Sequence, residues 1–299
     1  MRQITVDHHG HGDVDRIGAA LEIIQRDRLP EAEIIVKAGV YHEKLDFPET
    51  TVIHLRGDDP QTTVIAYDDY AEKRLPDGQP YGTFRTPTVT LRADHSRVSS
   101  LTIANTAGMG PTIGQAVALA ALGRHLELDH VRLLGHQDTL FTGGPGPQYY
   151  RACEIEGTVD FIFGPSHAIF DHCHIASVGR GYITAASTPA DVELGYVFVS
   201  CHLKNANTTP ASVFLGRPWR PFASVTFVDT AMDDHIRPEG WDNWRNPANE
   251  ATARYAEYGS YGPGADQAQR VSWAISAPLS EIPQDTALRP LLTRLGFLL

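Results

Sequence analysis

The sequence predicts an all-β protein: a single-stranded right-handed parallel β-helix (a solenoid) with a short N-terminal helix. Three observations support this fold class. A short apolar pattern recurs along the chain, helical periodicity is concentrated in one early segment, and glycine and proline are spread over the whole length instead of marking a linker. We therefore expect residues 1–299 to form one β-helix domain. An ordinary β-sandwich with chance internal similarities is the alternative.

The early segment "DRIGAALEIIQRD" (15–27) predicts an amphipathic helix. Its apolar residues recur at the spacing that gathers side chains on one helix face, and they are Ile17, Ala20, Leu21 and Ile24. A second apolar run, 116–122, is short enough to be a strand. The rest of the chain shows the features of many short strands.

The pattern apolar-x-x-apolar-x-apolar then occurs six times, at intervals of 20 to 30 residues. The copies begin at Val98, Leu128, Tyr150, Phe170, Phe198 and Phe227. One short strand per repeat at this period is typical of a solenoid whose coils stack in parallel.

Three cysteines hold the same place in three of these copies: Cys153, Cys173 and Cys201. Stacked coils would place them in an internal ladder of small buried thiols. A Cys173–Cys201 disulfide is the alternative if the protein meets an oxidising compartment.

Composition excludes several functional classes. The chain has 36 Asp and Glu against 25 Lys and Arg, a formal charge of −11, so it lacks the basic balance of a nucleic-acid binder. No apolar stretch approaches the length of a membrane span, and the N-terminus lacks the apolar core of a signal peptide. We expect a monomer that binds neither nucleic acid nor membrane, cytoplasmic if the chain is complete and secreted if a leader was removed.

One aspartate, Asp160, lies in the middle of the apolar run "EGTVDFIFG" (156–164), where an unpaired carboxylate would be costly. Residues one coil apart in a solenoid lie about 4.8 Å from each other. Gln115 and Gln137 are 22 residues apart, and Asp138 and Asp160 are also 22 apart. Two amides and two carboxylates are therefore predicted to gather on one face.

Two carboxylates at this distance favour one neutral and one ionised group. Arg217, in "FLGRPW" (214–219), is predicted to pair with Asp160 and keep it ionised. The amides of Gln115 and Gln137 are suited to hold a developing oxyanion. The set points to acyl transfer, with Asp160 as the nucleophile and Asp138 as general acid and then base.

These motifs resemble those of the pectin methylesterase (pectinesterase) family, which are β-helical carbohydrate esterases. The resemblance runs over most of the chain and implies one domain of this kind over residues 1–299. In chain order its segments are "AGVYHEK" (38–44), "GQAVAL" (114–119), "QDTL" (137–140), "IEGTVDFIFG" (155–164), "ITAASTP" (183–189), "LGRPW" (215–219), "GWDNW" (240–244) and "YGPGA" (261–265).

The resemblance implies a metal-independent aspartyl esterase without a cofactor. Its substrate would be pectin or methylated oligogalacturonides, from which it removes C6 methyl esters as methanol. Asp160 would carry the acyl group, Asp138 would protonate methanol and then activate water, and Arg217 would orient Asp160. Gln115 and Gln137 would stabilise the tetrahedral anion. The substrate-binding residues that it implies are Trp219, Phe161, Trp241 and Trp244.

Three segments depart from the family pattern. Phe141 stands where many relatives have a tyrosine, the loop 141–150 is rich in glycine and proline, and Pro165-Ser166 replaces a frequent Asn-Ala-like pair. None of them touches the five proposed catalytic residues. They bear on substrate length and methylation pattern.

Other functions stay open at this stage. They are a glycoside hydrolase or lyase on the same solenoid, an esterase or thioesterase for another acyl group, and a glycan-binding solenoid without catalysis. We assign no metal to the histidine-rich segment "DHHGHGD" (7–13). His136 is expected to point away from Gln137 in a strand and is not proposed as a base.

Overall fold

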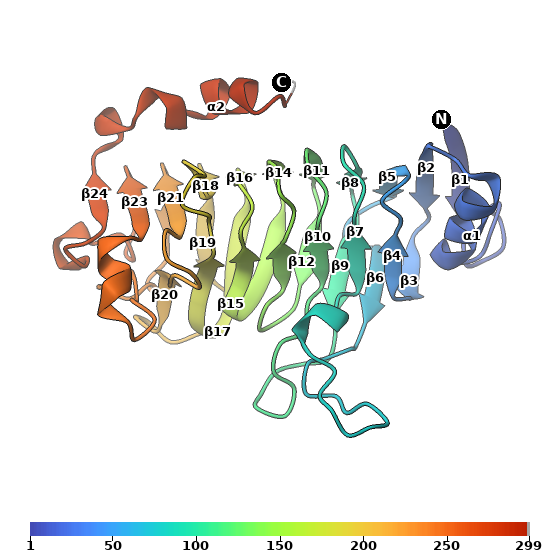
Figure 1. Ribbon diagram of the computed structural model, residues 1–299, viewed down its shortest axis with the longest axis horizontal. Helices are drawn as coiled ribbons and strands as arrows, with labels where there is room; N and C mark the ends of the chain where they lie inside the picture. Colours follow the sequence, from blue (N-terminus) through green and yellow to red (C-terminus); the bar gives the residue numbers. More distant parts are fainter. Residues whose placement is uncertain (298–299) are drawn as a thin grey trace.

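The computed structural model describes residues 1–297 and is a parallel β-helix, which confirms the predicted fold class (Figure 1). Each turn of the chain adds one short strand to each face, so the strands form rows along the solenoid axis (Figure 1). Residues 20 to 30 apart in the sequence therefore become neighbours in space, as in other stacked repeats.

One sheet of eleven strands forms a complete face. Its order is β1 (Arg2–Val6), β2 (Glu31–Val36), β5 (Val52–Gly57), β8 (Arg97–Ser99), β11 (Leu126–Asp129), β14 (Gln148–Arg151), β16 (Ala168–Asp171), β18 (Tyr196–Val199), β21 (Ser224–Val228), β23 (Arg254–Tyr258) and β24 (Ile275–Ala277).

A second sheet of thirteen strands forms two further rows. The first row holds β3 (Gly39–His42), β6 (Thr63–Tyr67), β9 (Thr102–Asn105), β12 (Arg132–Leu134), β19 (His202–Asn205) and β22 (Ala231–Met232). The other row holds β4 (Leu45–Phe47), β7 (Val89–Leu91), β10 (Leu119–Ala121), β13 (Leu140–Thr142) and β20 (Val213–Gly216). Two long strands, β15 (Glu154–Gly164) and β17 (His174–Ala186), pair with members of both rows and join them.

The predicted repeat is confirmed by the strand register of the eleven-stranded sheet. The six starting positions pair in order: Val98 with Leu128, Leu128 with Tyr150, Tyr150 with Phe170, Phe170 with Phe198, and Phe198 with Phe227. The same column extends to residues that the pattern search missed, namely Ile4, Ile34 and Leu55 before it and Glu257 after it. They escaped notice because a long excursion interrupts the period and because Glu257 is not apolar.

This inward-facing column changes character along the axis. Its first members are aliphatic, whereas the rings of Tyr150, Phe170, Phe198 and Phe227 stack with centroids 4.4–4.7 Å apart. It then reaches Glu257, whose side chain is fully buried and accepts two hydrogen bonds from Arg270 at 2.7 and 3.2 Å. Arg270 also donates to the main-chain carbonyls of Arg237, Pro238 and Gly264.

The corner that follows the eleven-stranded sheet has the same backbone conformation in coil after coil. Its residues have φ between 47° and 55°, and they are Ser100, His130, Ala152, His172, Ser200 and Asp229. Cys153, Cys173 and Cys201 come directly after three of these corners, and all three thiols are buried and free. The thiol ladder is confirmed, and the alternative Cys173–Cys201 disulfide is not formed.

The predicted N-terminal helix is α1 (Ile17–Asp27), and its buried residues are the four that the spacing indicated. It packs at the N-terminal end of the solenoid, beside β1 and β2 (Figure 1). The carboxylate of Glu43 accepts hydrogen bonds from the backbone N–H groups of Ile17 and Gly18 at 2.8 and 2.7 Å. These amide groups begin the helix and have no partner within it, so Glu43 caps them.

The C-terminal segment was not predicted as a helix, but it ends in α2 (Leu288–Arg294). This segment runs back over the outside of the eleven-stranded sheet (Figure 1), where Leu291 and Leu292 pack with Ile169 and Val197. No helix within residues 1–297 is long and apolar enough to cross a membrane. The short 3₁₀ helices are η1 (Thr83–Arg85), η2 (Pro247–Ala251), η3 (Gln267–Gln269), η4 (Leu279–Glu281) and η5 (Gln284–Thr286).

Candidate active site

The two aspartates occupy equivalent places on neighbouring coils. Leu140 of β13 pairs with Ile162 of β15, so Asp138 and Asp160 stand in register two residues earlier. Both have positive φ, 66° and 52°, a conformation that aspartate tolerates better than most residues. The pairing of β15 with β17 is irregular between Val159 and Ile162, and such bulges re-aim side chains.

One cleft of about 250 Å³ brings together most of the residues that the sequence singled out. All five proposed catalytic residues line it: Gln115, Gln137, Asp138, Asp160 and Arg217. Two of the four proposed substrate-binding residues, Trp219 and Trp244, line it as well. We call this the active-site cleft.

Asp160 forms a two-pronged ion pair with Arg217. The Arg217 Nε and Nη2 groups donate to the two Asp160 carboxylate oxygens at 2.9 and 2.7 Å. The Asp160 side chain is only 10% exposed and that of Arg217 20%. Burial raises the pKa of Asp160, and the hydrogen bonds and charge of Arg217 oppose that rise. The guanidinium is thus what makes a carboxylate tolerable in this apolar strand.

Asp138 has a different environment, because no basic side chain pairs with it among the described residues. Burial, and secondarily the negative charge of Asp160, raise the pKa of Asp138 well above its usual range, against a weaker opposing effect of Arg217. Of the two carboxyl groups, Asp138 is therefore the one whose environment favours the protonated form more strongly.

The two glutamines are held by their main chains and leave their side chains free. Gln115 accepts a hydrogen bond at its carbonyl from Ala71 N–H at 2.8 Å, and Ala116 N–H donates to the Gln137 carbonyl at 3.1 Å. Neither side-chain amide makes a hydrogen bond to any part of the chain that the structure describes. Both amides therefore have unused donors at the cleft.

The guanidinium of Arg217 lies between two aromatic rings. Its central carbon is 3.8 Å from the ring centroid of Tyr182 and 3.8 Å from that of Trp244. Stacking of this kind adds cation–π attraction to the ion pair and restricts the side chain. Trp244 thus supports Arg217 in addition to lining the cleft.

Two of the proposed substrate-binding residues are wrongly placed by the prediction. Phe161 is fully buried and Trp241 is 1% exposed, so both belong to the core instead of the cleft. Phe161 directly follows Asp160, where the positive φ and the irregular pairing between Val159 and Ile162 break the alternation of side chains, so Phe161 and Ile162 both pack in the core. Trp241 stacks inside on Tyr255 with centroids 4.1 Å apart.

Sequence reasoning also missed part of the cleft wall. Four more residues line it: Thr83, Phe84, Phe163 and Ala185. Phe163 follows Asp160 by three residues, and a regular strand would place it on the opposite face, so only the irregularity at Asp160 brings it to the cleft. Thr83 and Phe84 come from a long excursion between β6 and β7, and the repeat gives no signal for its position.

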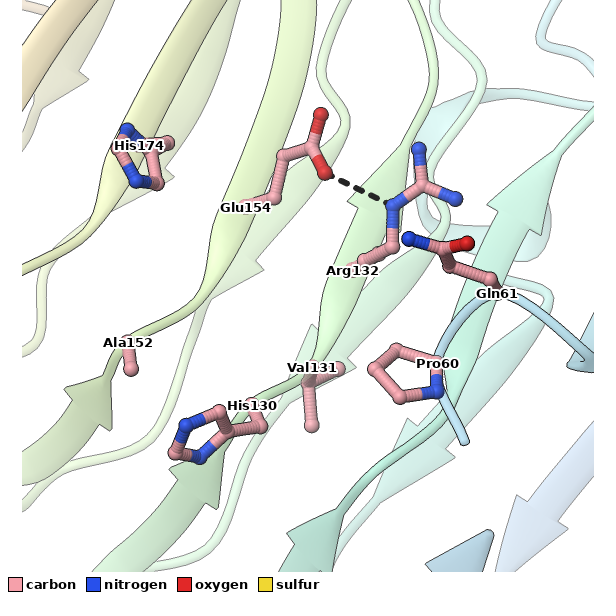
Figure 2. A pocket seen from close by; sticks show the side chains of 8 residues that line it. All are labelled: Pro60, Gln61, His130, Val131, Arg132, Ala152, Glu154 and His174. Carbon is pink, nitrogen blue, oxygen red and sulfur yellow. Dashed lines mark hydrogen bonds and ion pairs between the residues drawn. The ribbon is translucent and has the colours of Figure 1, made fainter. Parts of the chain in front are cut away.

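A second depression is larger, about 520 Å³, but has different chemistry. We call it the Arg132 groove, and Figure 2 shows its lining residues: Pro60, Gln61, His130, Val131, Arg132, Ala152, Glu154 and His174. Arg132 donates to Glu154 at 2.8 Å, and both side chains are about one-third exposed, at 32% and 35%. The charges of Arg132 and Glu154 are thus solvated and already neutralise each other. Among the described residues no cluster of three or more His, Cys, Asp or Glu could hold a metal ion.

The fold and the active-site cleft together define a class of protein, a carboxylic ester hydrolase built on a parallel β-helix. The pectinesterase family profile matches residues 3–286. Pectinesterase 31 of Arabidopsis thaliana is 35% identical over 280 residues, which cover 91% of this chain and 87% of that protein. The chain therefore belongs to the pectinesterase family.

Solved structures agree with this assignment. The pectin methylesterase of Aspergillus niger superposes with a TM-score of 0.83 at 29% identity, covering 98% of this chain and 95% of that one. A pectin methylesterase solved in complex with a hexasaccharide gives a TM-score of 0.80 at 28% identity, covering 97% of both chains.

Proposed function

We propose that this protein hydrolyses the C6 methyl esters of galacturonate units in pectin or methylated oligogalacturonides, with Asp160 as the nucleophile. The observation that carries the proposal is the unequal environment of two neighbouring buried carboxyl groups. Asp160 is paired with Arg217, whereas Asp138 has no cationic partner among the described residues. An ionised nucleophile beside a neutral acid is what ester cleavage through an acyl-enzyme requires.

In the first half-reaction, an Asp160 carboxylate oxygen attacks the ester carbonyl carbon. The carbonyl oxygen becomes an oxyanion, for which the free amides of Gln115 and Gln137 are suitable donors. When the tetrahedral intermediate collapses, the bond from carbon to the methoxy oxygen breaks, and Asp138 gives its proton to the departing methanol. The sugar is left joined to Asp160 as a mixed anhydride.

In the second half-reaction, Asp138 is ionised and acts as a general base. It takes a proton from a water molecule, whose oxygen attacks the carbonyl carbon of the anhydride. The bond from that carbon to the Asp160 oxygen then breaks, which frees the galacturonate carboxylic acid and restores the Asp160 carboxylate. Asp138 has regained the proton that it lost, so both groups end in their starting states.

The aromatic residues of the cleft suit a sugar polymer. Trp219 and Trp244 line the same cleft as the carboxyl groups, and flat aromatic faces pack well against the apolar faces of sugar rings. Relatives support this substrate class, because one structural neighbour was solved with a hexasaccharide. Every side chain in the proposed mechanism comes from this one chain, so the mechanism as written needs no residue from a second copy.

The test is methanol release from highly methylated pectin and from methylated trigalacturonate, with wild-type protein and Asp160→Asn at equal concentration. We expect release by the wild type and a loss of at least about 10³-fold in the variant, as for the removal of other covalent nucleophiles. New reducing ends would instead reveal a glycosidase or lyase.

The chain offers a matched control for this variant. Asp129 also forms a two-pronged pair, with the Arg151 Nε and Nη2 groups at 2.8 and 2.9 Å, on the eleven-stranded sheet away from the cleft. Asp129→Asn should therefore retain methanol release. Equal losses in both variants would count against a nucleophilic role for Asp160.

A further inference from the structure

One end of the active-site cleft is formed by a long excursion, residues 68–88, between β6 and β7. This segment and the neighbouring loop before β10 project from the body of the solenoid (Figure 1). The excursion supplies Thr83 and Phe84 to the cleft wall. Phe84 is 61% exposed, so burial alone does not fix its position. Something else must hold the excursion in place.

Two side chains fasten the beginning of the excursion to its end. Lys44 Nζ donates to the Asp69 carboxylate at 2.6 Å and also to the main-chain carbonyl of Arg85. The Asn105 amide donates to the carbonyl of Asp69 at 2.9 Å and, more weakly, to that of Thr86 at 3.5 Å. Lys44 comes from the corner before β4 and Asn105 from the end of β9, so both anchors belong to the rigid solenoid.

Asp69 is the centre of this fastening. Its side chain is 4% exposed and receives a second ammonium group, that of Lys73, at 2.6 Å. Burial alone would raise the pKa of Asp69, but the two lysines hold it below its usual value. A buried carboxylate that is compensated in this way resists leaving its place, because away from the two lysines it would be a buried unpaired charge.

The fastened excursion contacts the proposed oxyanion donor directly. Two residues beyond Asp69, Ala71 N–H donates to the main-chain carbonyl of Gln115 at 2.8 Å, and Glu72 N–H donates to Ile113 at 3.2 Å. On the other side, Thr86 Oγ1 accepts from Val117 N–H at 2.9 Å. Gln115 therefore lies in a loop whose two sides are both held by the excursion.

We propose that Lys44 and Asp69 are positioning residues for catalysis: their ion pair staples the excursion so that Gln115 stands where the transition state needs it. Neither residue touches the cleft, so the effect passes through the main chain of Ala71 to Gln115. The inference rests on the proposed function, in which Gln115 is an oxyanion donor. Small displacements of such a donor are costly, since about 1 Å can reduce a rate by about 10²-fold.

The test is a double-mutant cycle on methanol release from methylated pectin, with kcat and KM measured separately. Lys44→Met should lower kcat by about 10- to 100-fold with a smaller change in KM, and Asp69→Asn should act in the same direction. In a Gln115→Ala background the Lys44→Met change should cause little further loss, because the group that it positions is gone.

The control is Lys37→Met. Lys37 forms a similar lysine–aspartate pair with Asp58 at 3.0 Å, near the same end of the solenoid but with exposed side chains of 44% and 38%. It should keep wild-type kcat and KM. All variants are compared well below their melting temperatures, after circular dichroism shows that they are folded, and Asp69→Asn replaces Lys44→Met if the latter does not fold.

The outcomes separate the two proposals. If Gln115→Ala is impaired but Lys44→Met is not, or if their losses multiply in the double variant, the staple is overturned and the proposed function stands. If Gln115→Ala releases methanol at the wild-type rate, Gln115 is not an oxyanion donor. The proposed effect of the Lys44–Asp69 pair through Gln115 is then wrong as well. A loss of thermal stability in Lys44→Met with unchanged kcat would mean that the pair is structural only.

Discussion

The active-site cleft and the Arg132 groove are two polar depressions on one solenoid, and the larger of them has the more exposed charges. The groove has about twice the volume, about 520 Å³ against about 250 Å³. Its central ion pair is one-third exposed, whereas Asp160 in the cleft is 10% exposed beside the buried Asp138. Burial of one carboxyl group without a cationic partner, and not the size of the hollow, is what distinguishes the cleft from the groove, and strongly perturbed carboxyl groups of this kind are typical of functional sites.

The largest difference between the two regions should appear when their acidic groups are made neutral. Asp138→Asn removes the proposed general acid and base, which is worth about 10²- to 10⁴-fold, so kcat for methanol release should fall by that factor. Glu154→Gln in the Arg132 groove should change kcat by less than about twofold, because its charge is solvated and paired. A comparable fall of kcat in both variants would show that the cleft and the groove do not differ in their importance for catalysis.

The next largest difference is expected between lysine variants of Arg217 in the cleft and Arg132 in the groove, measured as kcat/KM. Arg217→Lys loses the two-pronged pair and the stacking between rings, so kcat/KM should fall by about 10- to 100-fold, the equivalent of the roughly 1.5–3 kcal/mol of hydrogen bonds to a charged group. Arg217 opposes the rise that burial causes in the pKa of Asp160. In the variant that pKa should therefore be higher, and the acidic limb of the kcat/KM profile should move to higher pH. Arg132→Lys should leave the profile in place.

A smaller effect is expected on stability, where Asp138→Asn should bring a gain although it lowers activity. The pKa of Asp138 is raised well above its usual range in the folded protein, chiefly by burial. The folded state therefore holds its proton more tightly than the unfolded chain does, and stability is lost as pH rises above the unfolded value of about 3.9. Asp138→Asn removes that loss, so it should melt higher than wild type at pH 7.

The expected gain is a few degrees, since about 1 kcal/mol corresponds to about 2–4 °C in a large domain. It should shrink as the pH falls towards about 4, where the aspartate of the unfolded chain is already about half protonated. Thermal melts from pH 4 to 8 would test this. A variant that is less stable than wild type at every pH would show that the ionised form of Asp138 does not destabilise the folded protein.

The smallest effect on activity and stability is expected for Arg132→Ala in the Arg132 groove. Arg132→Ala breaks an ion pair that is about one-third exposed on both sides, and such pairs contribute about 0–1 kcal/mol. We expect unchanged methanol release and a melting temperature within about 4 °C of wild type. A large loss of activity would mean that the groove communicates with the cleft.

The sequence predicted those parts of the site that obey the repeat. Asp138 and Asp160 share the period of the strands around them, so their meeting follows from the 22-residue spacing. Phe161 and Trp241 were misassigned because the identity of an aromatic residue does not say which side of the wall it faces. The excursion at 68–88 obeys no period, which is why neither Phe84 nor the Lys44–Asp69 pair could be found.

The fold, like the site, was predicted where it follows a local period and missed where it does not. The helix 15–27 and six members of one column of the repeat were predictable because their spacing reports directly on the buried face. The C-terminal helix α2 was not, because its leucines pack on the outer face of strands far away in the sequence. Local periodicity carries no information about such a distant partner.

The buried pair of Glu257 and Arg270 bears on how a protein of this kind changes length in evolution. Any coil of a stacked column can be copied, because its top matches the bottom of the next. The column beyond Phe227 instead meets a carboxylate and a guanidinium whose donors are engaged by the carbonyls of Arg237, Pro238 and Gly264. The strand that follows, β24, places Ser276 beside Glu257, so the next coil presents a polar side chain to the pair. An apolar side chain at that position would have to pack on a buried charge. The pair thus restricts which coils can follow it, whereas a coil copied upstream of it meets only apolar neighbours in the column.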